Sequence, residues 1–239
     1  MSIFNVVRAV TVALFALVMV GCQVPAQSVT VIADVPNNQL DLYQQSLPDF
    51  LDMPAKPKLV IIGEEATGFS DNAVDYREAV IGILASYKGV ERWWVLTQPL
   101  NDIAGYNSGI QLGYPKQLLD VCLDDNGRIF SFRVGCDDLF LEIKHRRNYW
   151  TRSMDFDFAT AFAQGQFSVG KDNCLKESVG SFDLDPDAER RPGQVSVNIT
   201  TGEPWTALFN NRVFDGQVYK GTVFNLKNEI TDLACGGRF

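Results

Sequence analysis

The chain has 239 residues, of which 46% are hydrophobic and 21% charged, and this composition excludes a wholly disordered protein. Its formal net charge is −8, and removal of the first 21 residues, which contain only Arg8 as a charged residue, leaves 218 residues with a charge of −9. A body this acidic is unsuited to nucleic acid, whose phosphates bind Lys and Arg, and anionic lipid head groups would repel it.

The N-terminus predicts export followed by lipid attachment. The apolar run of 12 residues at positions 9–20 fits the core of a signal peptide and is short for a membrane span. Residues 19–22 (Met-Val-Gly-Cys) then resemble the bacterial lipobox, which implies cleavage after residue 21 and a diacylglycerol thioether on Cys22. Because Gln23 follows, rather than Asp, the resemblance implies an outer-membrane lipoprotein facing the periplasm. The alternative is an ordinary cleaved signal peptide with an incidental cysteine.

Replacing Cys22 with alanine is therefore expected to give a protein that carries no lipid and no longer fractionates with membranes. The thioether requires the sulfur of this residue, and an acidic body has no other evident anchor. Metabolic labelling with a fatty acid measures the effect, and label on the Cys22→Ala protein would contradict it.

The predicted elements begin with a lipid-anchored tether and connector at residues 22–57. Alternating valines suggest an early strand at 29–35, and an apolar face at 40–47 suggests a short helix that ends before Pro48. Residues 58–239 are expected to form the globular body, with a sub-boundary near 110–115.

A βαβ unit is the next expectation. Residues 58–62 read as a strand, 71–88 as a helix that Gly89 ends, and 92–97 as a second strand. The helix is predicted from one apolar stripe at helical spacing: Tyr76, Val80, Ile83, Leu84 and Tyr87.

A hairpin is predicted around Asn126-Gly127, the strongest turn signal in the chain. With these two residues as the loop, Leu123 would face Phe130, and all apolar residues of the hairpin would share one face. Further alternating segments at 154–158, 195–199, 205–209 and 213–218 read as strands. The expected fold class is α+β, with an N-terminal βαβ-containing layer followed by a mainly antiparallel sheet.

Four cysteines remain in the body, and in an exported chain they predict two disulfides. The alternative is four reduced thiols. The hairpin register places Cys122 and Cys136 about five residues apart along the ladder, too far for a bond. We therefore expect this hairpin to be linked to Cys174 and Cys235.

No catalytic motif in the sequence has the local context that its chemistry requires. Ser168 and Lys171 match S-x-x-K literally, but the intervening Val-Gly disfavours a helix, so a turn is the better interpretation. His145, the single histidine, lies among Lys and Arg and is predicted to belong to an exposed basic cluster.

Two other groups of residues are candidate sites. Acidic residues alternate in one polar loop, which suggests either a calcium site or a solvated acidic loop: Asp183, Asp185, Asp187 and Glu189. Trp93 and Trp94 would point to opposite faces of a strand, so both lie in a core or one forms a contact surface for a partner.

A partial resemblance to a known family involves about 30 residues. Tyr87-Lys88, the stretch 92–103 and the segment 197–203 are similar to parts of curli-secretion-channel lipoproteins, which implies an envelope assembly role. The four cysteines of the body depart from that pattern.

The leading functional interpretation is a non-catalytic, lipid-anchored envelope protein that binds or scaffolds other envelope proteins, without a cofactor. It depends on the predicted anchor, on the cysteines and on the lack of a catalytic motif. The alternatives are a periplasmic hydrolase that uses carboxylates and a solute-binding lipoprotein. Two carboxylates with raised pKa would favour an enzyme.

Overall fold

A computed structural model describes residues 23–67, 75–148 and 158–236. The lipobox and the predicted strand at 154–157 therefore lie outside the described residues. Within them no helix has the length and apolarity needed to span a membrane.

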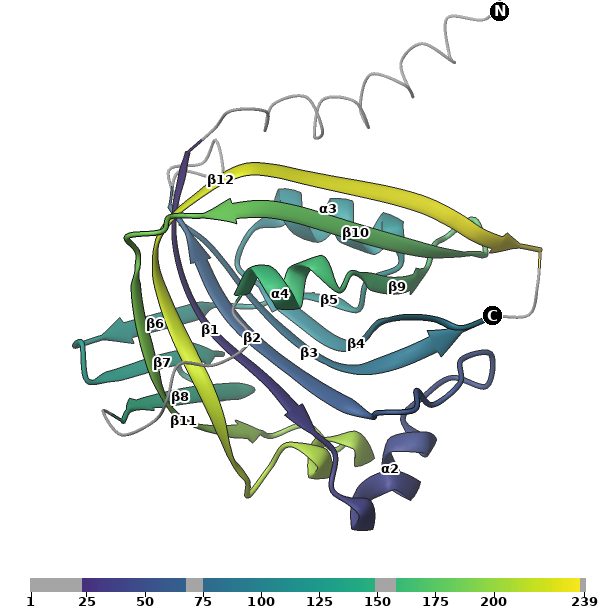
Figure 1. The fold of residues 1–239 in the computed structure, drawn as a ribbon, viewed down its shortest axis with the longest axis horizontal. Coiled ribbons are helices and arrows are strands. Elements are labelled where there is room, and N and C mark those ends of the chain that lie inside the picture. The colour runs from purple at the N-terminus through teal and green to yellow at the C-terminus, as the bar shows by residue number, and fades with distance from the viewer. Residues whose placement is uncertain (1–22, 68–74, 149–157, 237–239) are drawn as a thin grey trace, which may run out of the picture.

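Most of the chain is β-structure (Figure 1). The strands are β1 (Val24–Asp34), β2 (Lys58–Ala66), β3 (Tyr76–Tyr87), β4 (Val90–Leu100), β5 (Lys116–Leu118), β6 (Val121–Asp125), β7 (Ile129–Val134), β8 (Leu141–Arg147), β9 (Gln166–Val169), β10 (Cys174–Leu184), β11 (Glu189–Ile199) and β12 (Val213–Cys235). The helices are α2 (Leu40–Gln45), α3 (Ile103–Leu112) and α4 (Phe158–Ala163), with 3-10 turns at Asn37–Gln39 and Pro204–Leu208.

Seven of these strands close into a mixed barrel. Their order is β1-β2-β3-β4-β9-β10-β12, and β12 pairs again with β1. All neighbours are antiparallel except β4 and β9. Because β12 is 23 residues long, its first part also pairs with β11 and its last part with β10. The barrel therefore continues into an outer sheet of β11, β8, β7 and β6.

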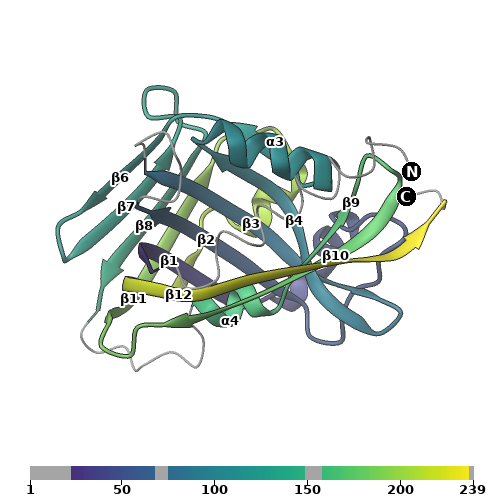
Figure 2. The ribbon, with the colours of Figure 1, turned by 90° about the horizontal axis from the view of Figure 1, so that it is seen from above.

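The strands β1–β4 are covered on both faces. One face packs against the outer sheet and forms the larger core, which includes Val29, Ile61 and Phe132. The other face lines the barrel, where Val60 and Trp93 pack around Ala161 of α4. Figure 2 shows α3 and α4 on opposite sides of the molecule.

The predicted α+β class is wrong, because residues 76–87 form strand β3 instead of a helix. Every residue from 78 to 85 is buried, since both faces of the strand meet a core. Apart from Glu78, these residues carry no polar side chain, so the strand loses its alternation and an apparent helical stripe appears by chance. The short helix α2 and the strands at 58–62 and 92–97 are confirmed.

The predicted hairpin forms as β6 and β7, but its register differs. Leu123 faces Phe132, not Phe130, and Cys122 faces Arg133. The chain then turns at Gly135, which has a φ of 71°, and Cys136 folds back onto Cys122. The expected disulfide connectivity is thus wrong: Cys122 bonds to Cys136, with a Cα–Cα distance of 5.8 Å, and Cys174 bonds to Cys235.

His145 is buried, which corrects its predicted place in an exposed cluster. It is 1% exposed and lies between Phe130 of β7 and Val195 of β11. Burial, followed by the positive charge of Arg191, lowers the pKa of His145 from 6.5 to about 4. The histidine is therefore neutral in the folded protein at neutral pH.

The titration of His145 predicts a loss of stability in mild acid. The unfolded chain takes up the proton near pH 6.5, whereas the folded chain does so only near pH 4. The contribution of neutral His145 to the unfolding free energy is therefore complete above pH 6.5 and is lost as the pH falls from 6.5 towards 4. Between pH 7.5 and 5, the unfolding free energy should fall by about 2 kcal/mol more in the wild type than in His145→Gln. Urea unfolding at both pH values checks this, and identical pH dependence in the two proteins would contradict it.

Candidate functional site

A buried lysine lies between acidic and phenolic side chains at one end of the barrel. Lys116 is the first residue of β5, and its Nζ forms a hydrogen-bonded ion pair with Glu78 of β3. Both side chains are 7% exposed. The hydroxyl of Tyr76 donates a hydrogen bond of 2.7 Å to the other oxygen of Glu78. The Glu78 carboxylate is thus held between an ammonium and a phenol.

A second carboxylate lies beside this pair. Glu64 of β2 is directly opposite Glu78, so both side chains are on the same face of the sheet. The pKa of Glu64 is raised to about 8, chiefly by burial and then by the charge of Glu78, while Lys116 opposes the shift. Burial and the same carboxylates also raise the pKa of Tyr76 well above its ordinary value. The site therefore contains a carboxyl group that titrates near neutral pH.

Helix α3 supplies the space for the lysine stem. Asp102 caps the helix by accepting a hydrogen bond of 2.6 Å from the backbone N–H of Gly105. One turn later, a Cβ on Gly109 would lie 2.1 Å from Cε of Lys116. The side chain of Lys116 can therefore pass α3 at this position only because residue 109 is a glycine.

Tyr114, between α3 and β5, connects the site to the opposite wall of the barrel. Its hydroxyl hydrogen-bonds with Ser178 and Ser168, while burial raises its pKa. Ser168, part of the apparent S-x-x-K motif, is thus a buried wall residue on β9. Opposite it on β10 lies Lys176, whose Nζ contacts Asp172 at 2.7 Å and Asp232 at 2.6 Å.

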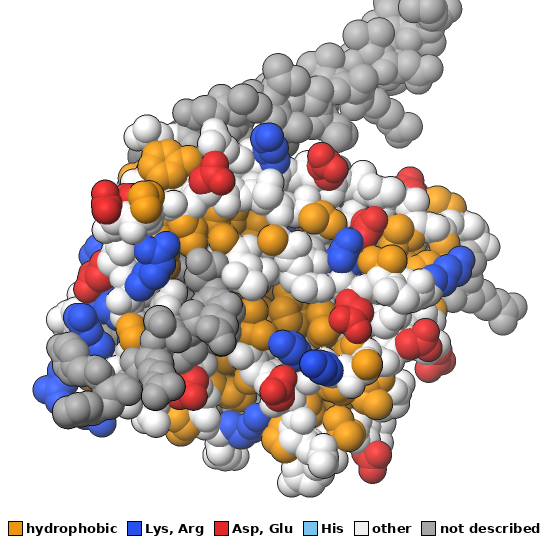
Figure 3. Space-filling view, in the orientation of Figure 1, with side chains coloured by type: hydrophobic (Ala, Val, Ile, Leu, Met, Phe, Trp, Pro, Cys, Tyr) orange, Lys and Arg blue, Asp and Glu red, His pale blue; other side chains and the backbone are white. Residues whose placement is uncertain are grey.

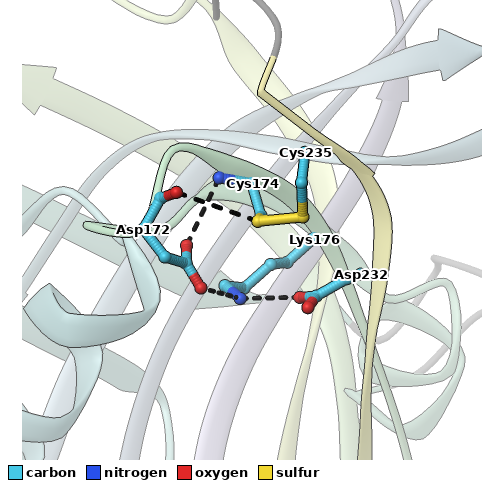
Figure 4. The surroundings of a disulfide bond; sticks show 5 residues. All are labelled: Asp172, Cys174, Lys176, Asp232 and Cys235. Atoms are coloured by element: carbon cyan, nitrogen blue, oxygen red, sulfur yellow. Dashed lines mark hydrogen bonds and ion pairs between the residues drawn. A yellow bond between two sulfur atoms is a disulfide. The ribbon is translucent and has the colours of Figure 1, made fainter.

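The disulfide Cys174–Cys235 lies next to this lysine and ties the end of β12 to the start of β10 (Figure 4). Together with Asp232, the two sulfur atoms form the one group of three metal-ligating atoms found in the part of the chain that the structure describes. Sulfur in a disulfide is not a thiolate, and metal binding requires the thiolate. This group is therefore structural.

Trp93 and Trp94 both take part in packing. Trp93 is 3% exposed inside the barrel, and its indole N–H donates a hydrogen bond of 2.9 Å to the carbonyl of Ala161. Trp94 packs on the outer face of the barrel against Phe50, with a ring-centroid distance of 5.9 Å. Their proposed contact with a partner protein stays a prediction.

The acidic residues of the candidate calcium loop have separate partners. Asp183 accepts a hydrogen bond from Asn225, Asp185 accepts one from the backbone N–H of Asp187, and Glu189 pairs with Arg147. Among the described residues these carboxylates do not form a metal-ligating group.

The residues around Lys116 are not among the sites predicted from the sequence. Glu64 follows an apolar strand, where an acidic residue is a usable signal, but Tyr76 and Glu78 fell within a segment assigned to a helix. Lys116 lies in no motif. The four side chains meet only because β2, β3 and β4 are consecutive strands of the barrel and β5 pairs with β4.

The fold resembles that of known enzymes. The enduracididine biosynthesis enzyme MppR complexed with pyruvate has a TM-score of 0.64 and 15% identity, covering 90% of this chain and 92% of that chain. Acetoacetate decarboxylase from Legionella pneumophila gives a TM-score of 0.62 at 15% identity, with 90% and 89% covered. An acetoacetate decarboxylase-like enzyme from Sphingomonas wittichii gives 0.60 at 13%, with 87% and 92% covered. No family model and no curated protein matches the sequence.

These likenesses establish an acetoacetate decarboxylase-like fold over about 90% of the chain. They overturn the resemblance to curli-secretion-channel lipoproteins, which involved only short βα segments. The interpretation as a non-catalytic envelope scaffold is corrected as well, because the chain shares its fold with three structures that are each named as enzymes. The candidate site is assembled from separate strands, so no single sequence motif marks it.

Proposed function

We propose that the protein is an enzyme of the lyase type that binds a small carbonyl compound as a Schiff base on Lys116. The observation that carries this proposal is the buried contact between Lys116 and Glu78 beside a second carboxyl group. A lysine amine adds to an aldehyde or ketone, a C–N bond forms, and the carbonyl oxygen leaves as water. The resulting iminium withdraws electrons from a neighbouring C–C bond, which can then break. Two compared structures support carbonyl chemistry, because one is named for acetoacetate decarboxylation and the other holds pyruvate.

The carboxyl groups fit the proton transfers that this reaction needs. The Lys116 ammonium must lose a proton before its nitrogen can attack, and Glu78 is in position to accept it. Glu64, with a pKa of about 8, can both take up and return a proton near neutral pH. The hydrogen bond from Tyr76 fixes the orientation of Glu78.

Reductive trapping tests the proposal. Cyanoborohydride converts an imine into a stable secondary amine, so incubation with a carbonyl compound should add the mass of that compound, less one oxygen atom, to the peptide that contains Lys116. Pyruvate, acetone and hydroxyacetone serve as probes. Lys116→Arg should abolish this label, because a guanidinium does not form the imine, while Lys227→Arg, on an exposed part of β12, should retain it. Label spread over exposed lysines with no enrichment at Lys116 would contradict the proposal.

We also propose that the enzyme works in the cell envelope, lipid-anchored through Cys22 and facing the periplasm. The lipobox-like sequence supports this location, and two disulfides in one chain are typical of an oxidising compartment.

A further inference from the structure

The barrel wall beside Lys116 contains polar groups that the protein leaves unsatisfied. Ser28, Thr30 and Gln98 are at most 5% exposed. Their Oγ, Oγ1 and Oε1 atoms have no hydrogen-bond partner among the described residues. A buried polar atom without a partner is costly, so native proteins rarely keep several together unless a ligand or water completes them.

These three groups face the candidate site. Ser28 of β1 lies directly opposite Glu64, and Glu64 lies opposite Glu78, so the three side chains form one row across the sheet. Thr30 is two residues further along β1 and therefore has the same orientation. Gln98 of β4 pairs directly with Lys116 of β5.

The charges near the lysine disfavour an anionic substrate. Glu78 already pairs with Lys116 and balances its charge, and Glu64, whose pKa is raised to about 8, adds no positive charge in either protonation state. Two other cations on the barrel strands are paired with carboxylates: Arg77 pairs with Glu65 at 2.7 Å, and Lys176 pairs with two aspartates. A substrate carboxylate would become a further anion in the site, with repulsion that is strongest where water is excluded.

The face of the molecule over the barrel is rich in apolar side chains, which also suits an uncharged ligand. Figure 3, which has the orientation of Figure 1, shows hydrophobic side chains gathered in the middle of this face. In the same view, Figure 1 shows α4 inside the arch that β10 and β12 form. Trp93, Val60 and Val95 contribute to the apolar lining of the barrel interior.

We propose that the substrate is an uncharged aldehyde or ketone that bears at least one hydroxyl group, rather than a keto acid. This inference rests on the proposed imine on Lys116 and specifies the compound that forms it. The substrate hydroxyl donates a hydrogen bond to Oε1 of Gln98 and accepts hydrogen bonds from the hydroxyls of Ser28 and Thr30. When the imine forms, the nitrogen of Lys116 bonds to the carbonyl carbon, and the carbonyl oxygen is released as one molecule of water.

Two probes of nearly equal size distinguish an uncharged, hydroxyl-bearing substrate from a keto acid. Hydroxyacetone and pyruvate share an acetyl group and differ in a CH₂OH group against a carboxylate. The full mature protein is titrated with each probe in the presence of cyanoborohydride, and the half-saturating concentration for label at Lys116 is measured by mass spectrometry. Labelling of the exposed Lys227 in the same samples corrects for the intrinsic reactivity of each probe.

Hydroxyacetone should half-saturate Lys116 at a concentration at least about tenfold lower than pyruvate. Thr30→Val, which keeps the shape but removes the hydroxyl, should raise the value for hydroxyacetone several-fold. Ser28→Ala should do the same, and it provides a second variant if one of the two fails to fold. Gly202→Ala, in an exposed turn with no atom within 4 Å of the added Cβ, is the control.

The outcomes distinguish this inference from the proposed function. Equal half-saturating concentrations, or tighter binding of pyruvate, would overturn the neutral substrate and leave the imine on Lys116 intact. An unchanged hydroxyacetone value in both folded variants would overturn the assigned hydroxyl contacts. Failure of every probe to label Lys116 would overturn the proposed function itself, and the inference with it.

Discussion

Replacing Gly109 with alanine is expected to reduce imine trapping at Lys116 by about 100-fold while the protein remains folded. The new Cβ would lie 2.1 Å from Cε and 2.5 Å from Cδ of the lysine, so the stem must leave its present course. A displacement of about 1 Å at a reacting group typically costs on the order of 100-fold in rate. Alanine is also a better helix residue than glycine by about 1 kcal/mol, which offsets part of the strain in α3.

The trapping rate constant with hydroxyacetone and the unfolding free energy in urea are the two measurements for Gly109→Ala. Gly202→Ala is the matched control, since the same methyl group is added where nothing is near. A drop in trapping with stability within about 1 kcal/mol of the wild type supports a positioning role for Gly109. Normal trapping by Gly109→Ala would mean that Lys116 reacts from another conformation, or that it is not the reacting group.

The elements that could be predicted from the sequence are those with local signals. Helix α2 ends before a proline, and the β6–β7 hairpin follows from Asn126-Gly127 and the alternation around it. The predicted hairpin register is nevertheless wrong. Asp125 pairs with Phe130, so the loop lies one residue further towards the C-terminus than predicted. A shift of this kind leaves the same residues on the same face, so the hydrophobic pattern cannot detect it.

Strand β3 and the candidate site required information that the sequence pattern does not contain. Burial of β3 on both faces depends on the closure of the barrel and on the outer sheet, and both result from pairings between distant segments. The same closure brings Ser28, Glu64, Glu78 and Lys116 together from four strands. No fixed spacing marks such a set, whereas Gly109, next to the Lys116 stem, and Gly105, next to Tyr76, are a weak local trace of it.

A buried ion pair between two strands of the outer sheet is also hydrogen-bonded to the barrel through Gln27, and its loss is the second large effect that we expect. Asp125 of β6 accepts two hydrogen bonds from Arg191 of β11, at 2.7 and 2.6 Å, and a third of 2.9 Å from Gln27 of β1. Arg191 is 1% exposed and Asp125 is 8% exposed at the side chain. Burial alone would raise the pKa of Asp125, but the hydrogen bonds from Arg191 and the backbone of Gly127 outweigh it, so the pKa is lowered.

Asp125→Ala should therefore cost about 3–5 kcal/mol of unfolding free energy, because it leaves the Arg191 guanidinium buried without its counter-charge. Arg191→Met alone should also destabilise, since Asp125 loses its counter-charge and keeps only the hydrogen bonds from Gln27 and the backbone of Gly127, but the double variant should recover much of the loss. Asp124→Ala is the matched control: Asp124 pairs with Arg133 but is 73% exposed, so its loss should cost less than about 1 kcal/mol. Urea unfolding at pH 7.5 of the wild type, the single variants Asp125→Ala and Arg191→Met, and the double variant gives the coupling energy of the buried pair. Equal costs for Asp124→Ala and Asp125→Ala would show that this contact does not hold the outer sheet on the barrel.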